Sequence, residues 1–182
     1  MTSFLQRMIG AAKLDVKIYE EVEADKNALG QALGVVVISS LAAGIGTLSG
    51  GGASGLIYGL ILALASWFIW AFITYLVGTK LLPEPQTKAD MGEMLRTIGF
   101  SSSPGIIRVL GIIPVLQMVV FLIAGIWMLV AMVIAVRQAL DYQSTWRAVG
   151  VCVIGWIIQA IIFYPILVAM SGPGGPETMP QP

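Results

Sequence analysis

Five long apolar stretches, separated by short polar links, follow one another along the chain. Each holds roughly 20 residues, which as an α-helix would be ~30 Å long and would match the hydrocarbon core of a bilayer. The pattern predicts an all-α membrane protein, a polytopic bundle of five transmembrane helices in one membrane domain, residues 27–170. The predicted spans are residues 28–48, 56–77, 94–113, 115–136 and 148–170.

The segment before the first span, residues 1–26, is amphipathic. Phe4, Met8 and Ile18 fall near one face at helical spacing, and Arg7 and Lys17 can then face lipid headgroups. The segment has no short apolar core before a small-residue cleavage site, as a signal peptide would have. We therefore expect an N-terminal interfacial helix that lies on the membrane.

The third predicted span contains residues that are rare in a regular membrane helix. Thr97, Ser101, Pro104 and Arg108 recur at steps of four, three and four, so they would share one helix face. Pro104 has no amide hydrogen and leaves the carbonyl of Phe100 without its helical partner. We predict a broken helix whose irregular backbone faces protein or water rather than lipid.

Arg108 is the one charged residue deep inside a predicted span, and no acidic residue lies in any span to pair with it. At the bilayer centre an arginine costs ~2.5–3.5 kcal/mol on insertion scales. Its candidate partners are Gln117, Gln159, backbone carbonyls near Pro114, or a lipid phosphate. Three interpretations stay open: a satisfied structural residue, a lipid headgroup site, or a transport residue.

An acidic patch, YEEVEADKN, ends the N-terminal segment. It is either a solvated helix end, with Asp25 or Asn27 capping the next helix, or a site for a cation or a basic partner. The candidate binding residues of the chain are therefore Glu20, Glu21, Glu23, Asp25, Arg96, Ser101, Pro104 and Arg108.

Two pairs of glycines, Gly30 with Gly34 and Gly55 with Gly59, have the small-xxx-small spacing that lets membrane helices approach closely. They either pack this bundle internally or form the face of a homodimer.

Composition excludes several functions. Hydrophobic residues make up 57% of the 182 residues and charged residues 11%, whereas a soluble domain has about 25% charged residues. The net charge is zero, so no overall field favours nucleic acid. The chain has no histidine and one cysteine, Cys152, which excludes a Cys/His metal cluster and Ser-His-Asp or Cys-His catalysis. We expect no enzymatic activity, no metal and no cofactor.

Nine of the ten basic residues lie in the N-terminal segment, in the link between the second and third spans together with Arg96 at the start of the third, and in the link between the fourth and fifth spans. With five spans, all three regions are on the same side of the membrane. The positive-inside rule then predicts a cytoplasmic N-terminus and a flexible outer C-terminal tail, residues 171–182.

Two runs, residues 14–46 and 95–156, resemble bacterial members of the Yip family, membrane proteins named for their interaction with Rab/Ypt GTPases. The resemblance implies five spans, a cytoplasmic N-terminus and a place in the bacterial inner membrane. Eukaryotic relatives bind prenylated small GTPases, but their cytoplasmic Asp-Leu-Tyr-Gly-Pro motif is absent here, so GTPase binding is not carried over. The resemblance rests on Gly99-Phe100 followed by Pro104, Ile113-Pro114, Trp127, Ala139-Leu140 and Trp146-Arg147-Ala148.

We therefore expect a non-enzymatic membrane scaffold or accessory subunit that packs against a membrane-protein complex or recruits a cytoplasmic partner. Its partners would be membrane lipids and a membrane protein or a second copy of the chain. The alternative is a transporter or lipid-handling protein that uses the broken third helix and Arg108.

Overall fold

The computed structural model describes the backbone of residues 2–47 and 54–170, without the side chains of residues 54–56, 163 and 165–170. Every regular element in these residues is helical, which confirms the all-α prediction. The elements are α1 (Phe4–Ala12), α2 (Val16–Ala24), η1 (Lys26–Ala28), α3 (Leu29–Gly46), α5 (Ser54–Leu76), η2 (Val77–Leu81), α6 (Met91–Phe100), η3 (Ser103–Ile112), α7 (Pro114–Ala139) and α8 (Thr145–Met170). Of the short elements, η1 and η3 are 3-10 helices and η2 is a π-helical turn.

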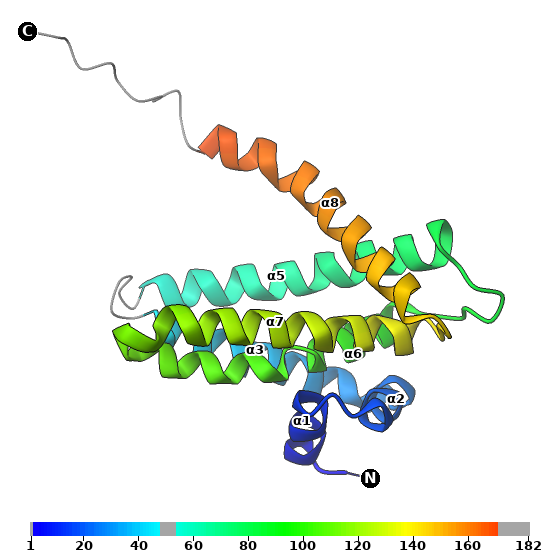
Figure 1. Ribbon diagram of the computed structural model, residues 1–182, viewed down its shortest axis with the longest axis horizontal. Helices are drawn as coiled ribbons and strands as arrows, with labels where there is room; N and C mark the ends of the chain where they lie inside the picture. The colour runs from blue at the N-terminus through cyan, green and yellow to red at the C-terminus, as the bar shows by residue number, and fades with distance from the viewer. Residues whose placement is uncertain (1, 48–53, 171–182) are drawn as a thin grey trace, which may run out of the picture.

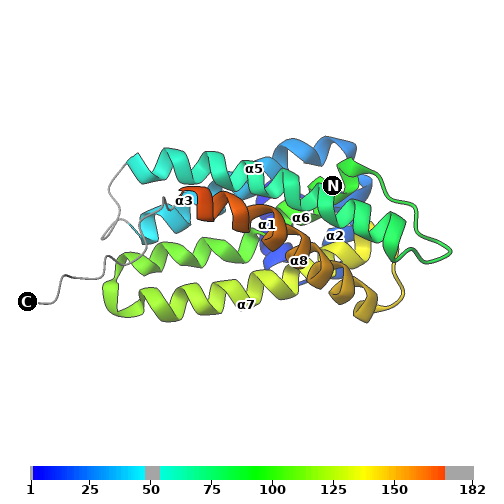
Figure 2. The same cartoon turned by 90° about the horizontal axis from the view of Figure 1, so that it is seen from above.

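The long helices form a bundle. Figure 1 and Figure 2 show α3, α5, η3 and α7 running along a common direction, with α1 and α2 set across one side of the bundle. Four helices of the described chain are long and apolar enough to cross a membrane: Lys26–Gly46, Ile57–Leu81, Pro114–Ala139 and Thr145–Ile162. The five-span count stays a prediction, because the third predicted span is divided between α6 and η3.

The break in that span lies where the sequence places it. Helix α6 ends at Phe100 and η3 begins at Ser103, with Pro104 in its first turn. The hydroxyl groups of Ser101 and Ser103 donate to the carbonyls of Ile98 and Phe100, both at 2.7 Å. The bond from Ser103 satisfies the carbonyl that Pro104 leaves without an amide partner, and the bond from Ser101 satisfies a carbonyl in the last turn of α6, so the backbone can be irregular inside the bundle.

The N-terminal segment differs from the prediction of one interfacial helix. It contains two helices, α1 and α2, which are separated by Leu14 with a φ of 64°. Ser3 caps α1 in a capping box with Gln6, and the carboxylate of Asp15 caps α2. The cap at Asp15 starts a new helix inside a segment that would otherwise continue as one amphipathic helix.

Both N-terminal helices belong to the packed interior. Ala11, Tyr19 and Val22 are fully buried against α3, α6 and α7, in a cluster that includes Phe100 and Ala135. A second apolar cluster joins α5, η2, α6, α7 and α8. The α1–α2 pair therefore packs as part of the bundle.

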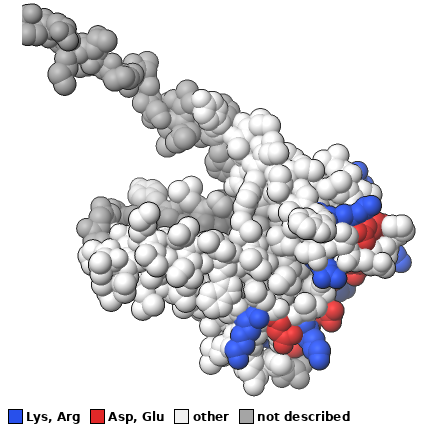
Figure 3. Space-filling model, in the orientation of Figure 1, with Lys and Arg blue, Asp and Glu red and all other residues white. Residues whose placement is uncertain are grey.

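Helix α8 is packed only over its first part. Ala148, Val151 and Gly155 are buried, but no described side chain from Trp156 to Tyr164 is buried. Figure 1 shows that α8 leaves the bundle at an angle after this point. In the same orientation, Figure 3 shows charged side chains over one end of the molecule and over α1 and α2, whereas the remaining described surface on this face carries none.

Candidate functional site: a cavity beside Arg108

Glycines place η3 and α6 directly against α3. A Cβ atom at Gly99 would lie 2.7 Å from the Cβ atom of Ala32, and one at Gly105 would overlap the hydroxyl of Ser39. The carbonyl of Arg108 likewise occupies the space that a side chain at Gly46 would need. Larger residues at these positions would push the helices apart, so the glycines set the depth at which Arg108 meets α3.

The glycines that the sequence singled out do not make these contacts. Gly30 and Gly59 face open space, and Gly34 makes an ordinary contact with Phe4 at 3.7 Å. Within the described residues, no other element lies within 4 Å of a Cβ atom at Gly30 or Gly59, and internal packing by these glycines stays a prediction. Gly55 lies outside the described side chains, and the homodimer interpretation stays a prediction.

Arg108 is half-buried and binds neutral groups of the bundle. Its Nε donates to the carbonyl of Gly105 at 3.0 Å, and its Nη2 donates to the hydroxyl and carbonyl of Ser39 at 2.8 and 3.2 Å. Of the candidate partners from the sequence, Gln117 donates instead to the carbonyl of Gly46. Among the described residues, no carboxylate forms an ion pair with Arg108.

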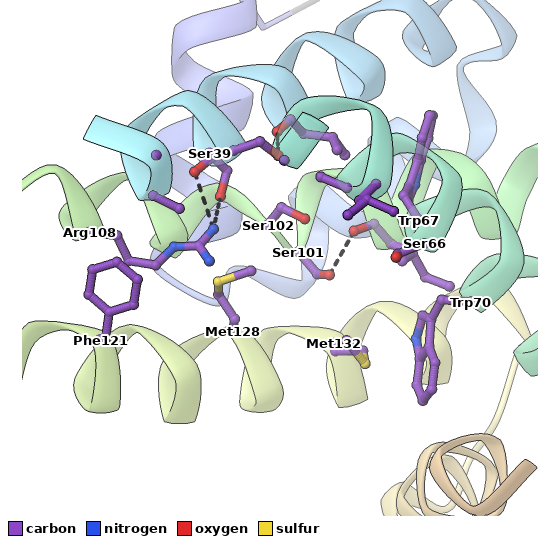
Figure 4. A pocket seen from close by; sticks show the side chains of 18 of the residues that line it. Ser39, Ser66, Trp67, Trp70, Ser101, Ser102, Arg108, Phe121, Met128 and Met132 are labelled. Atoms are coloured by element: carbon purple, nitrogen blue, oxygen red, sulfur yellow. Dashed lines mark hydrogen bonds between the residues drawn. The ribbon is translucent and has the colours of Figure 1, made fainter. Parts of the chain in front are cut away.

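The Arg108 guanidinium lines a cavity of about 580 Å³ between α3, α5, α6, η3, α7 and α8. Figure 4 shows Ser39, Arg108 and Met128 at one part of this cavity and Trp67, Trp70 and Met132 farther along it. The apolar wall consists mainly of Leu62, Trp67, Trp70, Ile98, Phe121, Met128, Met132 and Trp156, and the polar groups come from Ser39, Ser40, Thr47, Ser66, Ser101, Ser102, Arg108 and Gln159.

Several polar groups of the cavity have unused hydrogen-bonding capacity. Trp70 is 5% exposed, and its Nε1 is the one buried side-chain nitrogen or oxygen without a partner in the described part of the chain. The hydroxyls of Ser66 and Ser102 also make no hydrogen bond to the described residues. An unpaired buried donor costs about 1–3 kcal/mol, and this cost applies to Trp70 alone, whereas the partly buried hydroxyls of Ser66 and Ser102 can donate to a ligand or water in the cavity.

The predicted polar face of the third span reaches the cavity only in part. Ser101 and Arg108 line the cavity, whereas Pro104 is buried in the break and Thr97 bonds to the carbonyls of Glu93 and Met94. Arg96 lies elsewhere: its Nε donates to the carbonyls of Val22 and Glu23, both at 3.0 Å. Arg96 therefore binds the C-terminal end of α2, where carbonyl groups are left free by the helix.

The acidic patch is divided between two faces of α2. Glu21 and Asp25 each place an oxygen 2.8 Å from Nη2 of Arg7, and Asp25 also caps η1 through the amide of Asn27. Hydrogen bonds from Thr2 and Arg7 lower the pKa of Glu21, and the bond from Arg7 lowers the pKa of Asp25. Arg7 is thus buried within the protein, which corrects the expectation that it faces lipid headgroups.

On the other face, Glu20 and Glu23 line a second cavity of about 470 Å³ with Arg137, Gln138 and Asp141. Burial, and then the charges of Asp141 and Glu93, raise the pKa of Glu23 to about 7. In the described ranges, no group of three or more histidine, cysteine, aspartate or glutamate residues is arranged to hold a metal ion.

Sequence reasoning missed three residues of these sites. Ser39 is a polar residue inside an apolar span, which the sequence shows. Its hydrogen bond to Arg108 joins residues 69 positions apart, so spacing along the chain did not predict it. Arg7 was expected to face lipid headgroups, and neither its ion pairs nor the position of Trp70 in the cavity could be predicted locally, because both depend on which helices meet.

The long apolar helices and the broken helix between them define an integral membrane protein of the polytopic helical class. The chain belongs to the Yip1 domain family, whose model matches residues 16–167. This match confirms the family that was inferred from the sequence. No curated protein and no solved structure matches the chain.

Proposed function

We propose that the protein is a non-enzymatic membrane adaptor, a scaffold or accessory subunit that joins a cytoplasmic partner to a membrane complex. The observation that carries this proposal is the attachment of α1 and α2 to the membrane bundle by buried polar contacts. A segment fixed in this way transmits the position of a bound partner to the membrane helices.

Two side chains of the bundle make the attachment. Arg96 of α6 binds the carbonyls of Val22 and Glu23 at the end of α2. The indole Nε1 of Trp127 in α7 donates to the carbonyl of Ala12 at the end of α1, at 2.7 Å. Each contact connects a helix end to a different helix of the bundle, so the α1–α2 pair is held at two separate points.

The outer surface of the α1–α2 pair is charged with both signs. Its exposed charged residues are Lys13, Asp15, Lys17 and Glu20, and the exposed Lys26 follows in η1. Mixed exposed charges suit a polar protein partner and favour orientation of that partner over tight burial. The distribution of basic residues supports a cytoplasmic location for this surface, in a bacterial inner membrane protein with an outer C-terminus.

Helix α8 offers a second surface within the membrane. Ile157 is 54% exposed, Ile161 67% and Tyr164 70%. These exposed side chains support packing against a helix of a membrane partner or of a second copy.

Native mass spectrometry of the full-length protein, extracted in mild detergent from its own membranes at natural abundance, tests the adaptor function. We expect a stoichiometric protein partner, which is lost in the Lys13→Glu/Lys17→Glu variant and retained in the control Lys88→Glu, a charge reversal on an exposed loop residue. A lone monomer, or a partner that survives the double reversal, would contradict an adaptor that works through α1 and α2.

A second candidate function is lipid handling or transport, and the cavity beside Arg108 favours it. Intramembrane charges without a protein counter-charge are typical of substrate or lipid sites. The two candidate functions differ in what should remain bound in native mass spectrometry: a protein partner for an adaptor, and lipid for a lipid-handling protein.

A further inference from the structure

The guanidinium of Arg108 has N–H donors that make no hydrogen bond to the described residues. Arginine carries five N–H groups, and the bonds to Gly105 and Ser39 use Nε and Nη2 only. Within residues 2–47 and 54–170, Nη1 has no hydrogen-bond acceptor. In Figure 4 the guanidinium lies between Ser39 and Met128, at the wall of the cavity. The site thus presents a positive charge and free N–H groups inside an apolar bundle.

An anionic group is the chemistry that completes this arrangement. A buried charge without a counter-charge is costly, and pairing it with an anion recovers part of that cost. Carboxylate and phosphate groups also match the planar fork of arginine donors. The hydroxyls of Ser66 and Ser102, which make no hydrogen bond to the described residues, add further donors along the same cavity.

The rest of the cavity suits a hydrocarbon chain. Its wall is formed by tryptophans and by Met128 and Met132, and methionine adapts its shape to irregular apolar ligands. If each methylene takes roughly the ~30 Å³ of a water molecule in the liquid, a chain of about 16 carbons needs ~480 Å³. The cavity of about 580 Å³ therefore has room for one such chain and a small head.

The cavity opens at the surface between α5 and α8. Leu62 on α5 is 64% exposed and Trp156 on α8 is 44% exposed, and both also line the cavity. In a membrane this surface faces lipid, so an amphiphile can reach the cavity without crossing water.

We propose that this cavity binds an amphiphile with a carboxylate or phosphate head, with the head on Arg108 and one hydrocarbon chain along the tryptophan and methionine wall. The inference rests on the second candidate function and names its ligand class. Two sources supply this chemistry: a free fatty acid, or an anionic phospholipid whose other chain stays in the bilayer.

Native mass spectrometry of the purified full-length protein in mild detergent tests the proposal, with titration of oleate, dioleoyl phosphatidic acid and dioleoyl phosphatidylcholine. We expect the anionic probes to bind at least about tenfold more tightly than phosphatidylcholine, and Arg108→Gln to weaken them by about tenfold, a change of ~1.4 kcal/mol. The control Arg147→Gln removes the same charge from an exposed side chain and should leave binding unchanged.

A second pair of variants keeps the test decisive if Arg108→Gln does not fold. Gly59 lines the cavity and Gly30 does not, and a Cβ atom at either position meets nothing within 4 Å. Gly59→Leu should therefore fill part of the cavity without disturbing the bundle and lower the binding of both anionic probes, whereas Gly30→Leu should not.

Each outcome decides the proposal. Preferential binding of oleate supports the proposal with a fatty acid as the source, and comparable binding of oleate and phosphatidic acid supports it with a phospholipid as a further source. Equal affinity for phosphatidylcholine, blocked by Gly59→Leu, overturns the anionic head but leaves lipid handling in place. Binding that neither Arg108→Gln nor Gly59→Leu changes, or a cavity that takes up only water, overturns both.

Discussion

Arg7 on α1 and Glu21 on α2 form an ion pair, with Nη2 of the guanidinium 2.8 Å from Oε1 of the carboxylate. The Arg7 side chain is 2% exposed and the Glu21 side chain 31% exposed. The same guanidinium reaches Asp25 and donates through Nη1 to Gln31 on α3 at 3.0 Å. One side chain thus connects α1, the end of α2 and the first membrane helix.

Replacing Arg7 should weaken the contacts among α1, α2 and α3 and lower the stability of the fold. Hydrogen bonds to charged groups contribute about 1.5–3 kcal/mol each, and 1 kcal/mol corresponds to about 2–4 °C in Tm for a chain of this size. We expect Arg7→Gln to lower the Tm by roughly 3–12 °C in thermal unfolding followed by circular dichroism. The exposed Lys17→Gln is the matched control and should change the Tm little; equal Tm values for the two variants would argue against a structural role for Arg7.

Glu23 should make stability depend on pH. Its pKa is raised from 4.5 to about 7, first by burial and then by Asp141 and Glu93. The folded protein therefore binds a proton at Glu23 more tightly than the unfolded chain does. The stabilisation of the folded state by this proton is complete below about pH 4.5 and is lost as the pH rises through about 7.

The variant Glu23→Gln tests this pH dependence. It removes the titrating group, so its Tm at pH 8 should exceed that of the wild type, and its Tm should change less between pH 5 and pH 8. Glu20→Gln, a neighbour on α2 that is exposed, should keep most of the wild-type dependence. If the Tm of Glu23→Gln changed with pH as the Tm of the wild type does, the pKa of Glu23 would not be raised and its carboxylate would be ionised at neutral pH.

The close approach of α6 and α3 predicts opposite effects for two glycine substitutions. A Cβ atom at Gly99 would lie 2.7 Å from that of Ala32, whereas one at Gly30 meets nothing within 4 Å. Overpacking costs about 1–3 kcal/mol, and alanine gains up to about 1 kcal/mol of helix propensity over glycine. Gly99→Ala should therefore lower the Tm by a few degrees, and Gly30→Ala should leave it unchanged or raise it.

Trp127 should hold the end of α1 in place. Trp127→Phe removes the bond to the Ala12 carbonyl, a loss of about 0.5–1.5 kcal/mol, and keeps an aromatic ring. We expect faster amide hydrogen exchange at the end of α1, measured by mass spectrometry, with little change elsewhere. Trp146→Phe is the control, because Trp146 is 83% exposed; faster exchange at the end of α1 in both variants would contradict the assigned role.

The candidate site was predictable in part. Arg108 and Ser101 stood out because charge and hydroxyls are rare at membrane depth, and both line the cavity. Ser39 and Trp70 were not identified, since a serine or tryptophan in an apolar span is compatible with many positions. Gly30 and Gly59 matched a packing motif but face open space, because spacing along one helix does not say whether another helix lies beside it.

The sequence by itself determined the helical class, the long apolar segments, the break at Pro104 and the family. These features depend on local chemistry: the transfer of apolar side chains to lipid, the missing amide of proline, and the positions of charged residues. Only the tertiary structure decided which residues meet, such as Arg108 with Ser39 and Arg7 with Glu21. The membrane helices are apolar on nearly every face, so their pattern does not mark the side that packs inward, and the rotation and depth of each helix are set by contacts at glycines such as Gly99 and Gly105.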